Sequence, residues 1–504
     1  MKWEFVCVKK ETPESFCHSI LQLGVGKSKA LANLVMALAS NDTSNSATDL
    51  SRSPCYHYQY SSISDSIRGF HHCSAEQIEQ GKYDESRQHV EELLLPLKSD
   101  HLPEKFDDKF YLLNTDGTPI LRPHSPTLGD RSYVHVPNER VKGNRPVDIG
   151  YEYSVVGLNA RRPLYGVVEP AWNLPLSTRR VPTDVTRGTF TGQQVMDLLN
   201  SEHLPLGKEL VVNALDRQYA TPEYVTGTHD HDNLINIIRL KNNRNVWSQL
   251  TAEQVKERRQ SNEDQRGANA VYGEKYKLNK SDEWSLDADE CVSFGTKLGN
   301  GRNAIVKMEG FNNMLIRSKR GHNMKDKPFR LISIQLIDPL TNEPIFKRKM
   351  WLAVWGKRRM ELTLEQCFWS YRNRFDIEHY FRFGKQRLLM NDFQTPDVQH
   401  QDNWMEIVGL AYWLLWVASK EATPCVRKWQ KYDTRYKNRV KYNLRPTPSE
   451  VQRQLPSIIL GFEQGPFIPK GQIKSEGRKK GQNQPKRKHY KVVYKGKKRT
   501  RKPA

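Results

Sequence analysis

The sequence predicts an α/β protein: a mixed sheet with flanking helices, interrupted by a β-rich insertion. Two observations support this fold class. Between residues 106 and 248, short apolar runs of strand length alternate with segments of helical apolar spacing. After the segment 249–349, where the recognisable runs are strand-like, helical spacing returns at Thr363 and continues to about residue 418. A helical N-terminal region and a basic, mostly disordered tail complete the prediction.

The order of the elements between residues 106 and 248 narrows the fold further. Five strands are expected, at 109–116, 149–158, 164–169, 209–216 and 233–240. A helix is expected at 191–199, between the third and fourth strands, and a short helix between the last two. Three strands, a helix, a strand, a short helix and a strand is the order of a ribonuclease H-like core.

The flanking segments have their own patterns. Runs 28–38 and 74–95 of the N-terminal region have helical apolar spacing, and a Ser/Asn/Asp-rich loop lies between them. In the insertion, strand-like runs occur at 304–308, 329–337 and 349–355. We therefore divide the chain into a helical N-terminal region (1–105), the first part of the core (106–248), the insertion (249–349), the last part of the core (350–425) and a basic C-terminal region (426–504).

Two helices are expected in the last part of the core. Thr363 and Gln366 have the spacing of a capping box, which predicts a helix that runs from there to about residue 390. The apolar run 404–418 predicts a second, buried helix. Its longest uninterrupted apolar stretch is about 12 residues, too short for a membrane span of ~20 residues.

The charge of the chain indicates a polyanionic partner. The 504 residues carry a formal net charge of +22, and the tail from Lys470 contributes 15 Lys and Arg against one acid. The N-terminus has no secretory pattern, and the seven cysteines include no CxxC pair, which argues against a disulfide framework or a zinc finger. His71, His72 and Cys73 are a weak metal candidate, because no second ligand pair is near in sequence.

Four polar residues share one face of the predicted helix after Thr363. At ~100° per residue, Tyr371, Arg374, Glu378 and Lys385 fall within a stripe about 60° wide. One interpretation is an ordinary solvated face with an i,i+4 pair between Arg374 and Glu378. The other is a site that binds phosphate and metal, with Glu378 as a ligand.

Two aspartates favour the second interpretation. Asp116 and Asp216 each stand at the predicted carboxyl end of a strand, where open α/β sheets commonly bind ligands, although such an Asp can also serve only as a turn former. Two aspartates and a glutamate supply hard oxygen ligands, which suit Mg²⁺ or Mn²⁺. A pair of such ions catalyses phosphoryl transfer in many enzymes.

The spacing Tyr-x2-Arg-x3-Glu-x6-Lys resembles the Tyr-Arg-Glu-Lys signature of DDE insertion-sequence transposases, the "insertion sequence four" group and its relatives. The segment from Asp116 to Thr118 with Asp130–Tyr133, and the segment from Ala214 to Tyr219, are similar to the first- and second-aspartate regions of one branch. The end of the chain, KRKHYKVVYKGKK, also resembles that branch. The resemblance therefore extends over most of the chain from about residue 100.

The resemblance implies a ribonuclease H-like core with an insertion before the glutamate helix, and a DNA-binding role for the N-terminal region. It implies that Asp116, Asp216 and Glu378 are catalytic and hold two Mg²⁺ or Mn²⁺ ions. Arg374 and Lys385 would bind DNA phosphates, as would the Tyr371 hydroxyl. Trp351 and Trp355 are candidates for stacking on a flipped base; the alternative for each is an ordinary core tryptophan.

The predicted function is cut-and-paste DNA transposition in the bacterial cytoplasm, beside the nucleoid, with no membrane partner. The partners expected are double-stranded DNA, as transposon terminal inverted repeats and as target, and a second copy in a homodimeric synaptic complex. Three alternatives stay open: a ribonuclease H-like nuclease that cleaves without joining, a domesticated DNA-binding protein without catalytic activity, and a basic RNA-binding protein.

Overall fold

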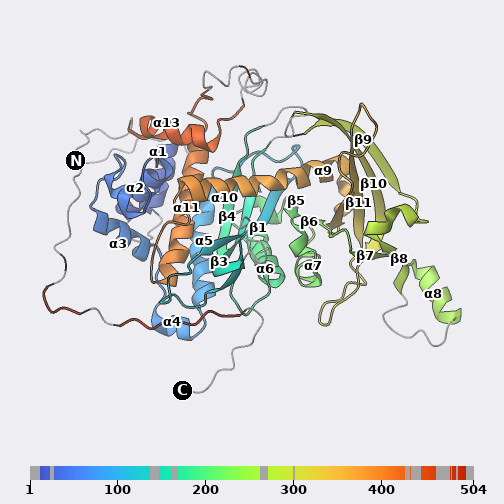
Figure 1. Ribbon diagram of the computed structural model, residues 1–504, viewed down its shortest axis with the longest axis horizontal. Helices are drawn as coiled ribbons and strands as arrows, with labels where there is room; N and C mark the ends of the chain where they lie inside the picture. The colour runs from blue at the N-terminus through green and yellow to red at the C-terminus, as the bar shows by residue number, and fades with distance from the viewer. Residues whose placement is uncertain are drawn as a thin grey trace.

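The structure is a computed structural model of the chain. It describes residues 12–22, 28–136, 147–161, 169–261, 271–298, 301–425, 432, 444–460, 477, 479–483 and 486–494. In Figure 1 a central sheet is flanked on one side by the N-terminal helices and on the other by the strands of the insertion.

The core sheet has the predicted topology. Its strands are β1 (Tyr111–Leu121), β3 (Val147–Asn159), β4 (Asn173–Arg180), β5 (Val211–Leu215) and β6 (Leu234–Arg239). β1, β5 and β6 are parallel neighbours, whereas β3 is antiparallel to β1 and β4 is antiparallel to β3. The resulting order, β4-β3-β1-β5-β6, is that of a ribonuclease H-like sheet. The predicted α/β fold class is confirmed.

The third core strand lies later in the sequence than expected. Most of the run 164–169 falls outside the described residues, and β4 takes the third place at Asn173–Arg180. Its Pro175 argues against a strand, because proline cannot donate to a strand ladder. The register of β3 and β4 shifts beside Pro175, opposite Gly157. A Cβ atom on Gly157 would lie 2.2 Å from Nδ2 of the Asn173 side chain. This irregular pairing therefore requires a glycine.

The strands of the insertion extend the core sheet. They are β7 (Asn245–Gln249), β8 (Tyr272–Lys277), β9 (Glu290–Lys297), β10 (Asn303–Leu315), β11 (Phe329–Ile337) and β12 (Met350–Trp355). β12 runs antiparallel beside β6 and continues the sheet through β11 to β10. The strand-like runs expected in this region correspond to β10, β11 and β12. The first three strands of the set are polar and partly exposed, so their apolar pattern is weak.

Helices cover both faces of the sheet. They are α6 (Arg187–Asn200), α7 (Pro222–Thr228), α9 (Leu364–Arg372), α10 (Asp376–Arg387) and α11 (Val398–Ala418), with α8 (Ala252–Ser261) in the insertion and α13 (Pro448–Leu460) near the C-terminus. Successive strand residues point to opposite faces. Accordingly Ala214 belongs to the apolar cluster that includes α9, and Leu215 to the cluster that includes α7.

The N-terminal helices pack on α11. They are α1 (Pro13–Gln22), α2 (Ser28–Ala39), α3 (Tyr60–Phe70), α4 (Ala75–Glu79) and α5 (Tyr83–Ser99). Helix α11 lies against α1, α2 and α3 and also against β4, and every residue of it from Gln401 on is buried. Among the described helices, none combines the length and the apolar composition that crossing a membrane requires.

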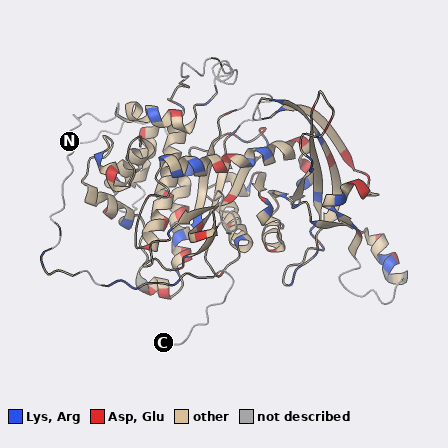
Figure 2. Cartoon of the chain, in the orientation of Figure 1, with Lys and Arg blue, Asp and Glu red and all other residues tan. Residues whose placement is uncertain are grey.

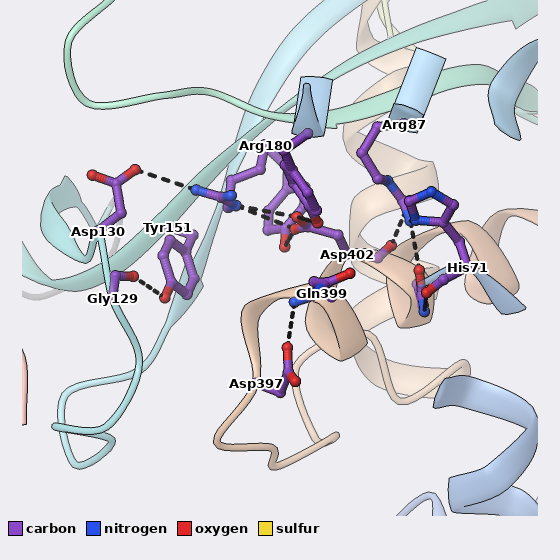
Figure 3. A network of polar contacts seen from close by, with 12 residues as sticks. His71, Arg87, Gly129, Asp130, Tyr151, Arg180, Asp397, Gln399 and Asp402 are labelled. Atoms are coloured by element: carbon purple, nitrogen blue, oxygen red, sulfur yellow. Dashed lines mark hydrogen bonds and ion pairs between the residues drawn. The ribbon is translucent and has the colours of Figure 1, made fainter. Parts of the chain in front are cut away.

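A buried polar network joins α11 to the core (Figure 3). The Asp402 carboxylate accepts hydrogen bonds from the Tyr83 and Tyr153 hydroxyls and from the Arg180 guanidinium. Arg180 also pairs with Asp130 at 3.3 Å, in the loop that precedes β2 (Ser132–His135). Asp402 therefore connects α11, α5, two core strands and this loop.

Part of the basic tail departs from the expectation of disorder. The backbone N–H of Tyr490 donates to the Pro126 carbonyl at 2.8 Å. The backbone N–H of Val493 donates to the Arg131 carbonyl at 2.7 Å. Val493 also forms a parallel bridge with Ser132 of β2. Residues 486–494 of the predicted tail are thus held against the core by backbone hydrogen bonds, although most of their side chains are exposed.

Asp402→Asn should destabilise the protein. The substitution keeps the shape of the side chain but leaves the buried Arg180 without its main countercharge, which costs about 3 kcal/mol. Urea unfolding of the full chain measures the loss. Asp397→Asn is the matched control: Asp397 caps the same helix through Gln399, and asparagine caps equally well. Equal stability of the two variants would contradict the assigned role of Asp402.

Candidate active site

Two of the three predicted acids lie on adjacent parallel strands. Thr115 of β1 is in register with Leu215 of β5, so Asp116 and Asp216 are the next residues along each strand. Asp216 follows the last residue of β5, as predicted. Asp116 lies within its strand, because β1 continues to Leu121; the prediction that this strand ends on the acid is wrong.

The third acid, Glu378, is brought to Asp116 by an arginine. Arg374 donates from Nη1 to Asp116 Oδ2 at 3.0 Å and from Nη2 to Glu378 Oε1 at 3.2 Å. The Arg374 side chain is only 5% exposed, compared with 21% for Asp116 and 46% for Glu378. The guanidinium thus sits below the two carboxylates, which face solvent more than it does.

The charges of the site act on one another. Burial raises the pKa of Asp116, and the neighbouring Asp216 raises it further, whereas Arg374 and the Gly117 N–H oppose the increase. Burial by itself would lower the pKa of Arg374, but Tyr371, Asp116, Asp216 and Glu378 outweigh it and raise that pKa. All three acids therefore stabilise the same buried cation.

The helix that carries the signature is not continuous. The capping box at Thr363 and Gln366 is present, but α9 ends at Arg372 and a 3-10 turn, Asn373–Phe375, precedes α10. The prediction of a single helix is therefore wrong at this point. Tyr371 belongs to α9, Arg374 to the turn, and Glu378 and Lys385 to α10.

Two asparagines hold the turn against the sheet. The side-chain amides of Asn114 in β1 and Asn159 in β3 donate to the Asn373 carbonyl at 3.0 and 3.2 Å. Arg161 adds an ion pair with the buried Asp376 at 2.6 Å. Sequence reasoning missed these anchors. Of these residues, only Asn114 could have been recognised from the sequence as part of the site. It lies two residues before Asp116 and therefore points to the same face of the strand.

A second arginine lies beside Asp116. Arg187, in the first turn of α6, forms an ion pair with Glu152 of β3 and hydrogen-bonds Gln218, which follows Asp216 by two residues. A Cβ atom on Gly117 would lie 3.0 Å from Glu152 Oε1 and 3.5 Å from Arg187 Cζ, so the glycine gives this pair its room. The sequence pattern indicated neither Arg187 nor Glu152.

The remaining residues of the signature are partly withdrawn from solvent. The Tyr371 ring is buried, and the Arg374 guanidinium lies 5.7 Å from its centre. Lys385 donates to the Pro119 carbonyl of β1 at 3.1 Å. Burial lowers the pKa of Lys385 to about 8. Lys385 thus lies along β1 from Asp116, still mostly charged at neutral pH, and loses its charge as the pH rises through about 8.

The two tryptophans proposed for base stacking belong to the core. Trp351 and Trp355 are 1% and 0% exposed. Trp351 packs against Trp284 with ring centres 5.2 Å apart, and Trp355 against Phe329 at 4.6 Å. Neither ring has a face open to a base in this structure, so base stacking by these residues is not supported.

The donor chemistry of the acids fits divalent cations. In the described part of the chain, no three His, Cys, Asp or Glu side chains converge at ligand distance; instead Arg374 stands between Asp116 and Glu378. The same three carboxylates stabilise that buried positive charge. A cation entering the site would therefore compete with Arg374 for the oxygens of Asp116 and Glu378.

Trp355→Ala should lower stability without a specific effect on DNA. Removing a fully buried indole leaves a large cavity and costs about 3–5 kcal/mol, and Trp355→Phe should cost less. Urea unfolding gives the stability, and fluorescence anisotropy gives the affinity for DNA well below the unfolding midpoint. Normal stability together with weakened DNA binding would restore Trp355 as a stacking residue.

The chain also matches a known protein family. The family model described as "DDE superfamily endonuclease" matches residues 27–298, which include Asp116 and Asp216 and end before Glu378. No curated protein matches the chain. Since the match spans more than half of the 504 residues, the chain belongs to the DDE superfamily endonucleases.

Proposed function

We propose that this endonuclease is a DNA transposase that cuts at transposon ends and joins them to target DNA. The observation that carries the proposal is the arrangement of Asp116, Asp216 and Glu378 around one buried arginine. The spacing of Tyr371, Arg374, Glu378 and Lys385, which resembles the transposase signature, supports transposition over simple cleavage.

The three acids would hold two Mg²⁺ or Mn²⁺ ions. Such a pair activates water for cleavage, or a 3′-hydroxyl for joining, and stabilises the leaving oxygen. Asp116 must be ionised to bind a metal ion. Because its pKa is raised, Asp116 is protonated at a higher pH than an ordinary aspartate when the pH falls. Arg374 serves as its countercharge until then.

The basic residues would bind the DNA backbone beside the scissile phosphate. Arg374, released from Asp116 and Glu378, has a planar fork that matches phosphate oxygens. Lys385 would supply a point charge. Tyr371 lies buried under Arg374 and would contribute mainly by supporting the guanidinium, with its hydroxyl reaching phosphate only if the turn at Asn373–Phe375 moves.

The proposal includes a homodimer that brings two inverted-repeat ends together, in the bacterial cytoplasm beside the nucleoid. The main alternative is a nuclease that cleaves without joining. A precleaved end that carries a free 3′-hydroxyl distinguishes the two: a transposase joins this end to target DNA, whereas a nuclease leaves it unchanged. A domesticated DNA-binding protein would neither cut nor join.

Asp116→Asn, Asp216→Asn and Glu378→Gln should each reduce Mg²⁺-dependent cleavage of the ends at least about a thousandfold, because each removes several kcal/mol of charge stabilisation. Gel assays with the DNA that flanks the gene measure cleavage, and anisotropy in EDTA verifies that binding persists. Glu253→Gln, an exposed acid of α8, is the control and should cut normally. Cleavage by Glu378→Gln at the wild-type rate would exclude Glu378 from the site.

Lys385 should make DNA binding depend on pH. A lysine is charged below its pKa, so raising the pH from 7 to 9 passes through the value of about 8 and removes the charge. Loss of a charge-assisted contact weakens binding about tenfold or more. Anisotropy in EDTA at constant ionic strength measures the effect. Lys385→Arg should bind equally at both pH values; a parallel fall in both proteins would assign the dependence to another group.

A further inference from the structure

Residues 486–494, named the C-terminal arm, are attached to the core at a defined place. Besides its two backbone hydrogen bonds, the arm accepts one from Arg131 Nη2 at the Tyr490 carbonyl, at 3.4 Å. The Tyr490 ring covers Gly129, where an added Cβ would lie 3.7 Å from it. The Tyr494 ring lies 5.2 Å from that of Tyr133 in β2. These contacts use the backbone and the aromatic side chains of the arm.

The surface beneath the arm is held firmly. Arg131 is buried and donates to the carbonyls of Leu128 and Arg122 within its own loop. Figure 3 shows how this loop joins the buried network: Tyr151 donates to the Gly129 carbonyl, and Arg180 reaches Asp130. The arm therefore rests on a loop whose position is set by the folded core.

The basic side chains of the arm are not used for docking. Lys486, Arg487, Lys488 and Lys491 are all exposed, and the arm is drawn with its Lys and Arg in blue in Figure 2. An extended chain advances ~3.3 Å per residue, close to the ~3.4 Å rise per phosphate of one DNA strand. By contrast, the N-terminal region 1–105 contains more Asp and Glu than Lys and Arg.

We propose that the C-terminal arm is a fixed contact for the sugar–phosphate backbone of duplex DNA. Docking fixes to the core a segment with four exposed cationic side chains, which would neutralise phosphates without reading base sequence. The inference rests on the proposed function only in taking DNA as the substrate. It adds a position on the catalytic core at which DNA outside the cleavage site is held.

Two variants of the full chain separate charge from docking. The first neutralises the four cations (Lys486→Gln, Arg487→Gln, Lys488→Gln and Lys491→Gln) and keeps the backbone hydrogen bonds. The second, Tyr490→Pro with Val493→Pro, keeps every charge but removes the two N–H donors that hold the arm. Val492→Pro is the control, since its N–H has no partner among the described residues.

Binding is measured by anisotropy in EDTA on random-sequence duplex DNA and on DNA that flanks the transposon end, over a range of salt concentrations. The charge variant should bind at least about tenfold more weakly, and its slope of log K against log salt should be smaller by up to about 3.6, or ~0.9 for each lost phosphate contact. Weakening on both DNAs supports a contact that does not read base sequence, and weakening on the flanking DNA alone would contradict it.

The docking variant should keep the salt slope, bind more weakly, and lose an ordered block of hydroxyl-radical protection that the wild type and Val492→Pro share. Wild-type affinity and slope in the charge variant would overturn the proposal, as would a wild-type footprint and affinity in the docking variant. Because cleavage is absent from these assays, the result is independent of the Asp116→Asn and Glu378→Gln tests.

Discussion

The Arg374 guanidinium is the interaction on which the candidate site depends. Burial of Asp116 raises the free-energy cost of ionising its carboxyl group, and repulsion from the neighbouring Asp216 adds to that cost. Arg374 offsets both effects by pairing with Asp116 and Glu378 from beneath. It can do so only because the chain tightens into a 3-10 turn at Asn373–Phe375, and because Asn114 and Asn159 bind the Asn373 carbonyl there. The position of Arg374 between Asp116 and Glu378 is therefore supported by neutral amides from two strands.

The rest of the fold supports that turn from behind. Helix α10 lies against β1, β3 and β4, and α11 lies against β4 on one side and the N-terminal helices on the other. The buried Asp402 joins α11 to Arg180 of β4, and Arg180 reaches the loop that carries the C-terminal arm. A continuous chain of packed and hydrogen-bonded groups thus links the arm to the N-terminal helices, with α11 as the common element.

The sequence predicted what local patterns determine. Alternation and strand order predicted the ribonuclease H-like sheet, and the i,i+4 spacing predicted the pairing of Arg374 with Glu378. The features that the sequence did not predict depend on contacts between distant segments. Strand β4 tolerates Pro175 because its register with β3 shifts there. The turn before α10 is held by residues more than 200 positions earlier in the chain. The burial of Trp351 and Trp355 and the docking of the arm likewise depend on partners that no local pattern shows.

The central claim is that Asp116, Asp216 and Glu378 together form one site for two divalent ions. Electron paramagnetic resonance of Mn²⁺ tests it most directly, because it counts bound ions without requiring catalysis. With DNA bearing the flanking ends, the wild-type chain should bind two Mn²⁺ ions, and Asp116→Asn, Asp216→Asn and Glu378→Gln should each lose at least one. Two ions bound with unchanged affinity in all three variants would contradict the account.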